Sequence, residues 1–381
     1  MKISFDAQLL LKGQKTGIGW CAENILLNLR HELNSFYSLN LFTLGYDKQR
    51  LNSFEKYKKL GYELRKCSWF NDVIYKLLSE FFHIPYSLFF GHNADMTLFF
   101  NYIVPAGVKG KKVVIVYDMA YKAYPETVRK RTRFMLNKSL RKSCNRADKI
   151  ITISKFSKQE IIKYLGVDEN KIVIMPIGVD LSIFHPNYSE KDICQITEKY
   201  KIPREYLLFL GTIEPRKNLE RLIRAYALLK AEIPNVPKLV LAGGKGWLYE
   251  NIFKTVRILN MESDIIFTGY VNEEDSPILI NGAKIFLFPS LYEGFGMPPL
   301  EAMACGIPVI ASNAASLLEV VGDAAILVDP FSIDSIKEGM KHLLEDENKR
   351  NELSFKGMER AKQFTWDKSA EIIRKVFEEL H

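Results

Sequence analysis

Short apolar runs alternate with amphipathic stretches along the whole chain, and the runs have the length of buried β-strands. Helix-like stretches lie near 18–34, at 127–144 and after Ser154. The alternation predicts an α/β fold with two doubly wound parallel sheets, whose ligand sites lie at the carboxyl ends of the strands. The apolar runs of the first half cover residues 2–8, 38–46, 96–104, 111–119, 147–154 and 170–178. Those of the second half cover residues 206–212, 238–244, 264–271, 283–290, 307–312 and 324–330.

Length and composition also favour two domains. The chain has 381 residues, of which 47% are hydrophobic. A globular chain of this length is too long for one ordinary hydrophobic core. The polar segment from about Asp180 to Pro203 has the composition of a linker. We therefore expect one sheet on each side of that segment.

The cysteines are typical of a protein in a reducing compartment, and the N-terminal segment does not predict secretion. No C-x-x-C pair occurs, the first residues are too short and polar for a signal peptide, and no apolar run approaches the roughly 20 residues of a membrane span. We therefore expect a cytoplasmic protein, soluble or peripheral to the membrane. The five cysteines are Cys21, Cys67, Cys144, Cys194 and Cys305.

Positive charge is concentrated in the first half of the chain. Residues 1–185 hold 29 Lys and Arg against 16 Asp and Glu, whereas the remainder holds 24 against 29. The densest basic segment is 127–142, TVRKRTRFMLNKSLRK. An anionic membrane surface is one interpretation and a solvated helix face is the other. Nucleic acid is not expected as a partner, because no recognisable nucleic-acid motif accompanies the charge.

Two carboxylates, Glu293 and Glu301, flank a glycine-rich turn that follows the apolar run at 283–290. Gly294 and Gly296 let the backbone approach a ligand closely, and the amides that open the next helix favour an anion. The two carboxylates could hold different ends of one elongated ligand. Alternatively, Glu301 serves the helix dipole and Glu293 is a loop charge.

Two adjacent cations, Arg216 and Lys217, follow the strand predicted at 206–212. They could neutralise a diphosphate, Arg216 through its planar fork and Lys217 as a point charge. A solvated pair at a helix start is the alternative, but the helix macrodipole disfavours cations there.

Two weaker candidates lie in the first half. Gly17 and Gly19 precede a helix-like stretch and could admit a phosphate or a sugar, although two glycines also make an ordinary turn. Tyr117 and Asp118 end the strand predicted at 111–119. Asp118 is either a catalytic or orienting carboxylate or the cap of the next turn.

Four motifs together look like a family 4 retaining glycosyltransferase of the GT-B fold. They are EPRKN at 214–218, the Glu293–Glu301 pattern, TGIG at 16–19 and FTW at 364–366, and they cover essentially the whole chain in the expected order. The resemblance implies two facing Rossmann-like domains: an acceptor-side domain at 1–185 and a nucleotide-sugar domain at 186–365. It also implies a terminal helix at 366–381 that crosses back to the first domain, at Trp366.

The resemblance assigns roles to the site residues. It implies that Arg216 and Lys217 bind the donor diphosphate, that Glu293 contacts the sugar hydroxyls and that Glu301 holds the ribose. It makes Asp118 a catalytic candidate together with Arg216, Lys217 and Glu293. The remaining donor contacts are Val271, whose backbone reads the base, the amides of Gly294, Phe295, Gly296 and Met297, and Gly17 and Gly19 at the phosphate.

Two positions depart from the family pattern. Such enzymes often have His-Asp where this chain has Tyr117-Asp118, and a tyrosine with a pKa near 10 is a poor cation at neutral pH. Leu318 stands where related chains often have proline. The role of position 117 is therefore the weakest part of the resemblance.

The expected chemistry needs neither a metal nor a cofactor. The chain contains no Asp-x-Asp, the usual carrier of a metal-bridged diphosphate, and fixed cations with helix-start amides can stabilise the leaving group instead. The acceptor then attacks from the face of the leaving group with retention, and a phosphate oxygen serves as the base.

The resemblance implies a transfer of a hexose, with GDP-mannose as the expected donor, to a glycan or lipid-linked acceptor of a bacterial surface polysaccharide. A non-hydrolysing sugar-nucleotide epimerase shares the same two-domain plan. A nucleotide-dependent oxidoreductase is the less favoured alternative, because G-x-G-x-x-G after a strand is missing.

Overall fold

The computed structural model of the protein describes residues 1–11, 17–29, 35–79, 81–91 and 93–381. The chain forms two compact units. The first consists of Met1–Met119, Lys130–Gly178 and Trp366–His381, and the second of Ala120–Arg129 and Val179–Thr365. The boundary therefore follows Gly178 rather than residue 185, and Ala120–Arg129 groups with the second unit, in which Trp247 Nε1 donates to the Thr127 carbonyl.

The first unit contains a seven-stranded parallel sheet in the order β3-β2-β1-β4-β5-β6-β7. The strand order reverses between β1 and β4, and open α/β sheets commonly bind ligands at the carboxyl ends of the strands at such a point. The strands are β1 Lys2–Asp6, β2 Phe36–Phe42, β3 Glu63–Cys67, β4 Met96–Phe99, β5 Lys111–Ile115, β6 Lys149–Thr152 and β7 Ile172–Ile174.

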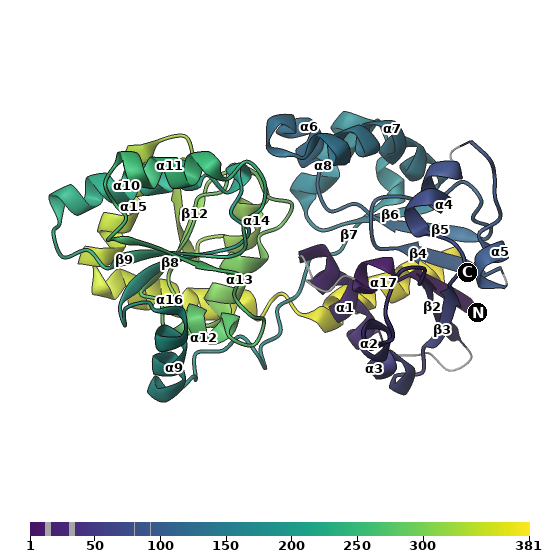
Figure 1. Ribbon diagram of the computed structural model, residues 1–381, viewed down its shortest axis with the longest axis horizontal. Helices are drawn as coiled ribbons and strands as arrows, with labels where there is room; N and C mark the ends of the chain where they lie inside the picture. Colours follow the sequence, from purple (N-terminus) through teal and green to yellow (C-terminus); the bar gives the residue numbers. More distant parts are fainter. Residues whose placement is uncertain (12–16, 30–34, 80, 92) are drawn as a thin grey trace. The chain divides into compact units, whose positions relative to one another are not determined.

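Helices lie on both faces of this sheet (Figure 1). The terminal helix α17 packs against α1, and Ser369 Oγ donates to the Pro176 carbonyl at 2.6 Å. Trp366, the first residue of α17, is buried in this unit. The α-helices are α1 Gly17–Asn28, α2 Lys48–Asn52, α3 Glu55–Lys59, α4 Asp72–Leu78, α5 Ser87–Phe90, α7 Lys130–Arg146, α8 Lys155–Leu165 and α17 Trp366–Leu380. The short 3-10 helices are η1 Gln8–Leu11 and η3 Glu169–Lys171.

The second unit contains a six-stranded parallel sheet in the order β10-β9-β8-β11-β12-β13. Here the order reverses between β8 and β11. The strands are β8 Tyr206–Leu210, β9 Lys238–Ala242, β10 Ile265–Gly269, β11 Ile285–Phe288, β12 Val309–Ser312 and β13 Ala325–Val328.

Helices also cover both faces of the second sheet (Figure 1). The α-helices around this sheet are α9 Glu190–Tyr200, α10 Leu219–Glu232, α11 Glu250–Ile258, α12 Ser276–Asn281, α13 Met297–Ala304, α14 Leu317–Val321, α15 Ile333–Glu345 and α16 Glu347–Ala361. The short helix α6 Ala120–Ala123 also groups with this unit. The 3-10 helices are η2 Pro125–Thr127 and η4 Pro215–Lys217.

The predicted pair of doubly wound parallel sheets is confirmed, because each of the twelve apolar runs contains a strand. Strands such as β4, β11 and β12 are buried at every residue, as expected for strands covered by helices on both faces. The strand β3 was missed: its sequence, ELRKC, is polar because β3 lies at the edge of the sheet, and Cys67 is its buried residue. Within the described residues, no helix combines the length and the apolar character needed to cross a membrane.

Candidate active site

The candidate site lies where the strand order of the second sheet reverses. Strands β8 and β11 are neighbours there, so the loops that follow them meet at the same edge of the sheet. The backbone amide of Leu291 donates to the carbonyl of Arg216 at 2.9 Å and joins the two loops directly. The motifs at 214–218 and 293–301, which are 76 residues apart at Lys217 and Glu293, are thereby brought together.

The loop after β8 is shaped by close backbone packing. A Cβ atom on Gly243, at the end of β9, would collide with the carbonyl oxygen of Gly211, so position 243 requires glycine. Asn218 adopts a left-handed conformation (φ 61°), and its side-chain amide donates to the carbonyls of Pro289 (3.0 Å) and Pro330 (2.7 Å). Asn218 thus fixes η4 to the segments that follow β11 and β13.

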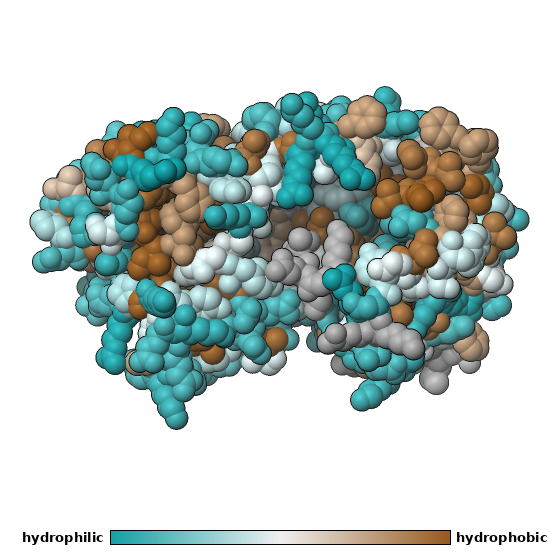
Figure 2. All heavy atoms as spheres, in the orientation of Figure 1, coloured by the Kyte–Doolittle hydropathy of each residue, from teal (hydrophilic) through white to brown (hydrophobic). Residues whose placement is uncertain are grey.

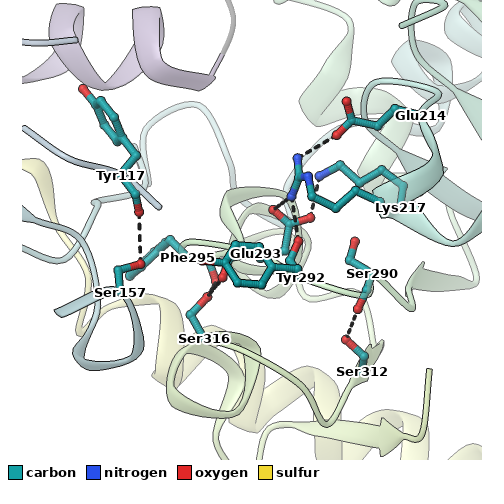
Figure 3. Close-up of polar contacts among 11 residues, drawn as sticks. Tyr117, Ser157, Glu214, Lys217, Ser290, Tyr292, Glu293, Phe295, Ser312 and Ser316 are labelled. Carbon is teal, nitrogen blue, oxygen red and sulfur yellow. Dashed lines mark hydrogen bonds and ion pairs between the residues drawn. The ribbon is translucent and has the colours of Figure 1, made fainter. Parts of the chain in front are cut away.

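The loop after β11 is held by α14 and by the serine that precedes it. Gly296 has a φ of 116°, and a Cβ atom there would approach Leu317 Cδ2 to 2.5 Å, so only glycine fits without rearrangement. The buried Ser316 hydroxyl lies 2.9 Å from the carbonyls of Glu293 and Phe295 and can donate to either. These contacts fix the turn that presents Glu293 and the start of α13 (Figure 3).

Four charged side chains form one compact network at this position, in which Glu214, Lys217 and Glu293 are buried and the fourth, Arg216, is 18% exposed (Figure 3). Arg216 bridges two carboxylates: its Nη2 lies 2.7 Å from Glu214 Oε1 and its Nη1 lies 2.8 Å from Glu293 Oε2. Lys217 Nζ lies 2.6 Å from Glu293 Oε1 and 4.7 Å from the centre of the Phe288 ring. Two cations and two carboxylates are thus held rigidly at the carboxyl ends of β8 and β11.

Burial and the neighbouring charges set the protonation of this network. Burial alone would raise the pKa of Glu293, but the charges of Arg216 and Lys217 outweigh it and lower that pKa to about 2. Burial lowers the pKa of Lys217, and Glu293 opposes the shift. Burial raises the pKa of Glu214 against the attraction of Arg216 and Lys217. Glu293 is therefore a permanent carboxylate at neutral pH, and neither a proton donor nor a general base.

Glu301 lies on α13 and is in a different environment from Glu293. It is partly buried, and burial raises the pKa of its carboxyl group to about 7. A ligand hydroxyl that donates to Glu301 would favour the ionised form. The charge of Glu301 therefore responds to pH near neutrality, whereas that of Glu293 does not.

The other donor-contact candidates of the second unit lie around this network. Gly294, Phe295 and Gly296 form the turn between β11 and α13, and Met297 is the first residue of α13. Phe295 is buried with its ring against Phe364, at 5.6 Å between ring centres. Its backbone is therefore the part that can face a ligand.

Val271 lies two residues after the end of β10 and is buried. Strand β10 stands at the far edge of the sheet, separated from β8 by β9. No contact joins Val271 to the charged network within the described residues. Its proposed contact with a base stays a prediction.

In the first unit, the expected loop around Gly17 and Gly19 is replaced by a helix. Helix α1 begins at Gly17, so both glycines lie in its first turn, and Thr16 of the same motif lies outside the described residues. Asp118 lies between β5 and α6, partly buried, as expected for a residue at a strand terminus.

Tyr117 belongs to the core of the first unit. Its side chain is buried and directed toward α1, where its hydroxyl faces the thiol of Cys21, and Ser157 Oγ donates to its backbone carbonyl (Figure 3). Burial raises the pKa of Tyr117 well above its usual value and that of Cys21 to about 12. The tyrosine is thus neutral and packed, which removes the reason to seek a charged role at this position.

Three residues of the site escaped the sequence reasoning: Glu214, Asn218 and Ser316. Glu214 and Asn218 flank the two predicted cations within EPRKN, so their proximity in the sequence was a usable signal. Ser316 lies in the segment after β12, the strand that neighbours β11 in the sheet. Nothing in its local sequence marks it as a residue of the site. Its role depends on a turn that only the tertiary structure brings near.

Comparisons with known proteins identify the family of the chain. The family model described as Glycosyl transferases group 1 matches residues 193–360, and the one described as Glycosyltransferase Family 4 matches residues 22–183. The chain is 38% identical over 269 residues to O-antigen chain mannosyltransferase B of Escherichia coli, covering 70% of each chain. The chain therefore belongs to the family 4 glycosyltransferases.

Among these enzymes, the chain is similar to bacterial mannosyltransferases. It is 36% identical over 237 residues to the serotype-specific mannosyltransferase WbdA of Escherichia coli, a longer protein of which the match covers 29%. Among solved structures, Anabaena HepE in complex with UDP and glucose aligns over 100% of both chains, with a TM-score of 0.75 and 19% identity. WaaG, a glycosyltransferase involved in lipopolysaccharide biosynthesis, aligns over 99% of both chains with a TM-score of 0.73 and 16% identity. These structures identify the GT-B fold.

Proposed function

We propose that this glycosyltransferase transfers a hexose from a nucleotide-diphosphate sugar, with retention of configuration and without a metal ion. The observation that carries the proposal is the network of Glu214, Arg216, Lys217 and Glu293 at the reversal point of the second sheet. Open α/β sheets bind their ligands at this point. The two cations stand where a donor diphosphate would meet the first turn of α13.

The network supports stabilisation of a leaving diphosphate. Arg216 and Lys217 are already fixed by carboxylates before any ligand arrives, so little reorganisation is needed when negative charge develops on the leaving group. Glu293, ionised at neutral pH, can accept hydrogen bonds from sugar hydroxyls between the two cations. In this proposal the network positions the donor and the phosphate oxygen takes the proton of the acceptor.

The proposed donor is GDP-mannose, and the proposed acceptor is a glycan or a lipid-linked glycan of a surface polysaccharide. Support comes from the names of the relatives, which are O-antigen and serotype-specific mannosyltransferases. A third relative, the MMP alpha-(1->4)-mannosyltransferase of Mycolicibacterium hassiacum, is 29% identical over 234 residues. The Anabaena HepE structures hold UDP and glucose or UDP-glucose, so the fold also accommodates uridine donors.

The proposal places the enzyme in the cytoplasm, at the inner face of the membrane. Residues 127–142 carry the charge that an anionic headgroup layer attracts, and each basic residue near such a surface contributes about 1 kcal/mol. Nucleic acid is not a proposed partner. A lipid-linked acceptor would be reached by an enzyme held at that surface.

Donor identity can be tested by thermal unfolding with GDP, UDP, dTDP and their sugar conjugates. A ligand present at 100 times its Kd stabilises the native state by about 2.7 kcal/mol, so the preferred nucleotide gives the largest rise in Tm. We expect GDP and GDP-mannose to give that rise. A rise with UDP or dTDP alone would overturn the guanine assignment, and no rise with any nucleotide would overturn the site.

The reaction can be tested by incubating the enzyme with GDP-mannose and a lipid-linked acceptor, with and without EDTA. We expect an α-linked mannose, because the donor is α-configured, and equal rates in both conditions. A β-linked product would contradict retention, and loss of activity in EDTA would contradict metal independence. Conversion of the nucleotide sugar without an acceptor would instead identify an epimerase.

A further inference from the structure

Helix α4 in the first unit turns its charged side chains inward. Lys76 lies 3.0 Å from Asp6 and 2.8 Å from Asp72, and its side chain is 19% exposed. Tyr75 beside it is fully buried. Burial opposes the charge of Lys76, but Asp6 and Asp72 outweigh this effect and raise its pKa. The polar groups of α4 are therefore satisfied within the protein.

The outward face of α4 is apolar. Val73, Ile74 and Leu77 form a stripe at helical spacing, with Ile74 50% and Leu77 57% exposed. Phe81 and Phe82 follow the helix and are exposed by more than 60%. Figure 2 shows hydrophobic atoms gathered over α4 and the neighbouring chain. We call Val73, Ile74, Leu77, Phe81 and Phe82 the apolar surface of α4.

Two features lie beside this apolar surface. Trp69, 59% exposed, precedes α4 and stacks on Phe89 at 5.2 Å between ring centres. Lys138 of α7 places its ammonium group 4.8 Å from the centre of the Phe81 ring, so α7 borders the apolar surface directly. One turn before Lys138, Phe134 also projects into solvent.

Helix α7 is strongly basic. It contains no acidic residue, and its apolar contacts with the core are made by residues such as Leu136 and Leu140. The combination of an exposed apolar surface, a basic flank and an aromatic residue at the border is typical of proteins that lie in the interface of an anionic membrane. The basic residues of α7 are Lys130, Arg131, Arg133, Lys138, Arg141, Lys142 and Arg146.

We infer that the apolar surface of α4 inserts into an anionic lipid bilayer while the basic side chains of α7 contact the headgroups. This inference rests on the proposed contact between residues 127–142 and a membrane, and it adds the part of the chain that enters the apolar layer. The two charged side chains of α4, Asp72 and Lys76, are paired inside the protein, so neither has to enter the apolar layer. Headgroups of negative charge complement the acid-free helix α7.

A second copy of the chain is a weaker candidate for this surface. A twofold contact buries the same patch of both copies in one interface. The basic flank of one copy would then share that interface with the basic flank of the other, and like charges disfavour such a contact. An anionic bilayer has no such conflict.

The inference can be tested by co-sedimentation of the full-length protein with vesicles. Vesicles of phosphatidylcholine alone are compared with vesicles that contain 30% phosphatidylglycerol, roughly the surface charge at which basic segments bind. We expect the protein to bind the anionic vesicles, and Ile74→Ser/Leu77→Ser to lower the partition coefficient about tenfold or more. The control Ile258→Ser/Phe355→Ser removes two equally exposed apolar side chains from the second unit and leaves binding unchanged.

A variant with a neutralised basic face, called the basic-face variant, separates the insertion of α4 from the proposed contact of residues 127–142 with the membrane. Neutralising Arg129, Lys130, Arg131 and Arg133 should also weaken binding, and added salt should weaken it further. If the basic-face variant loses binding and the α4 variant keeps it, the basic contact holds and the insertion of α4 is wrong. If the wild type binds no vesicles and Ile74→Ser/Leu77→Ser changes the oligomeric state, the surface is instead an interface between copies.

Trp69 offers a second readout that needs no variant of α4. A tryptophan that enters the bilayer interface shifts its emission to shorter wavelength. We expect this blue shift when anionic vesicles are added to the wild type, and its loss in Trp69→Phe. An unchanged spectrum in the wild type would overturn the insertion even if the protein sediments with the vesicles. Neither measurement requires donor or acceptor, so failure of the transfer assay leaves the result intact.

Discussion

The ends of β5 in the first unit and of β8 and β11 in the second carried the main chemical candidates, and the structure treats them differently. At β8 and β11, four charged side chains meet in a network that is largely buried. At the end of β5, the side chain of Tyr117 turns into the core against α1. The sequence prediction rested on the same observation in both units, namely that the candidate residues follow the end of a predicted strand.

The difference teaches that a strand end predicts an edge of the sheet but not the direction of a side chain. Arg216 lies in η4 and Glu293 in the loop after β11, both several residues beyond their strands, where the chain has turned and the two side chains face each other. Tyr117 lies only two residues beyond β5, and the hydroxyl of Ser157 holds its carbonyl. The Tyr117 side chain packs against Cys21 of α1 and is buried, as is the preceding residue, Val116.

The largest effect is expected from Lys217→Ala. Loss of a fixed cation beside the leaving group should lower kcat/KM about 100-fold or more. It also leaves Glu293 with one cation instead of two, so we expect a loss of stability of about 3 kcal/mol. Transfer kinetics and thermal unfolding measure the two effects separately. Lys230→Ala, which removes a partly exposed partner of Asp264, should change stability by less than about 1 kcal/mol and leave transfer unchanged.

A smaller effect is expected from Glu214→Gln, which tests whether a buried carboxylate positions Arg216. The substitution removes one of the two carboxylates that hold the guanidinium group but keeps the shape of the side chain. We expect about a tenfold loss, mainly in kcat, since Arg216 still binds Glu293. Glu232→Gln, which disturbs a surface pair with Lys337 and Lys341, is the control and should leave both parameters unchanged.

Glu301 should make the stability of the protein depend on pH near neutrality, whereas Glu293 should not. Its pKa of about 7 in the folded state lies above the unfolded value, so its stabilising contribution is full below about pH 4.5 and is lost as pH rises through 7. Relative to Glu301→Gln, we expect the wild type to lose about 1–2 kcal/mol of unfolding free energy between pH 5 and pH 8. Parallel curves for the two proteins would contradict the raised pKa.

The same titration should affect donor binding. The resemblance assigns Glu301 to the ribose, and an ionised carboxylate accepts hydrogen bonds from hydroxyls better than a protonated one does. We therefore expect affinity for the donor nucleotide to rise about fivefold from pH 6 to pH 8. Calorimetric titration of the wild type and Glu301→Gln measures this. A rise of equal size in the variant would place the titrating group elsewhere.

The smallest effect is expected from Tyr117→Phe. The hydroxyl is buried and faces the Cys21 thiol, a weak hydrogen-bonding group, so its removal should change stability by less than about 1 kcal/mol and leave kcat within about twofold. Tyr206→Phe is the matched control, because the buried Tyr206 hydroxyl donates to the Leu279 carbonyl at 2.6 Å and its loss should cost about 1 kcal/mol. A large fall in transfer for Tyr117→Phe would return position 117 to the reaction.

The sequence predicted much of the fold because buried parallel strands are continuous apolar runs, as in β11 and β12. It failed at β3, whose position at the edge of the sheet permits charged residues. It also placed Gly17 and Gly19 in a loop, whereas α1 already begins at Gly17. The glycines disfavoured a helix by propensity, and the helix forms nonetheless.

The sequence by itself determined the α/β class, the order of the elements and the residue types of the candidate site, because each follows from local periodicity and short motifs. Only the tertiary structure decided that Glu214 joins Arg216 and Lys217 around Glu293, that Tyr117 packs against Cys21, and that α4 faces outward with its apolar side. Each of these depends on contacts between residues far apart in the chain. Burial and ion pairing determine the protonation state of these side chains and the direction in which they point. Both arise only when the sheets form.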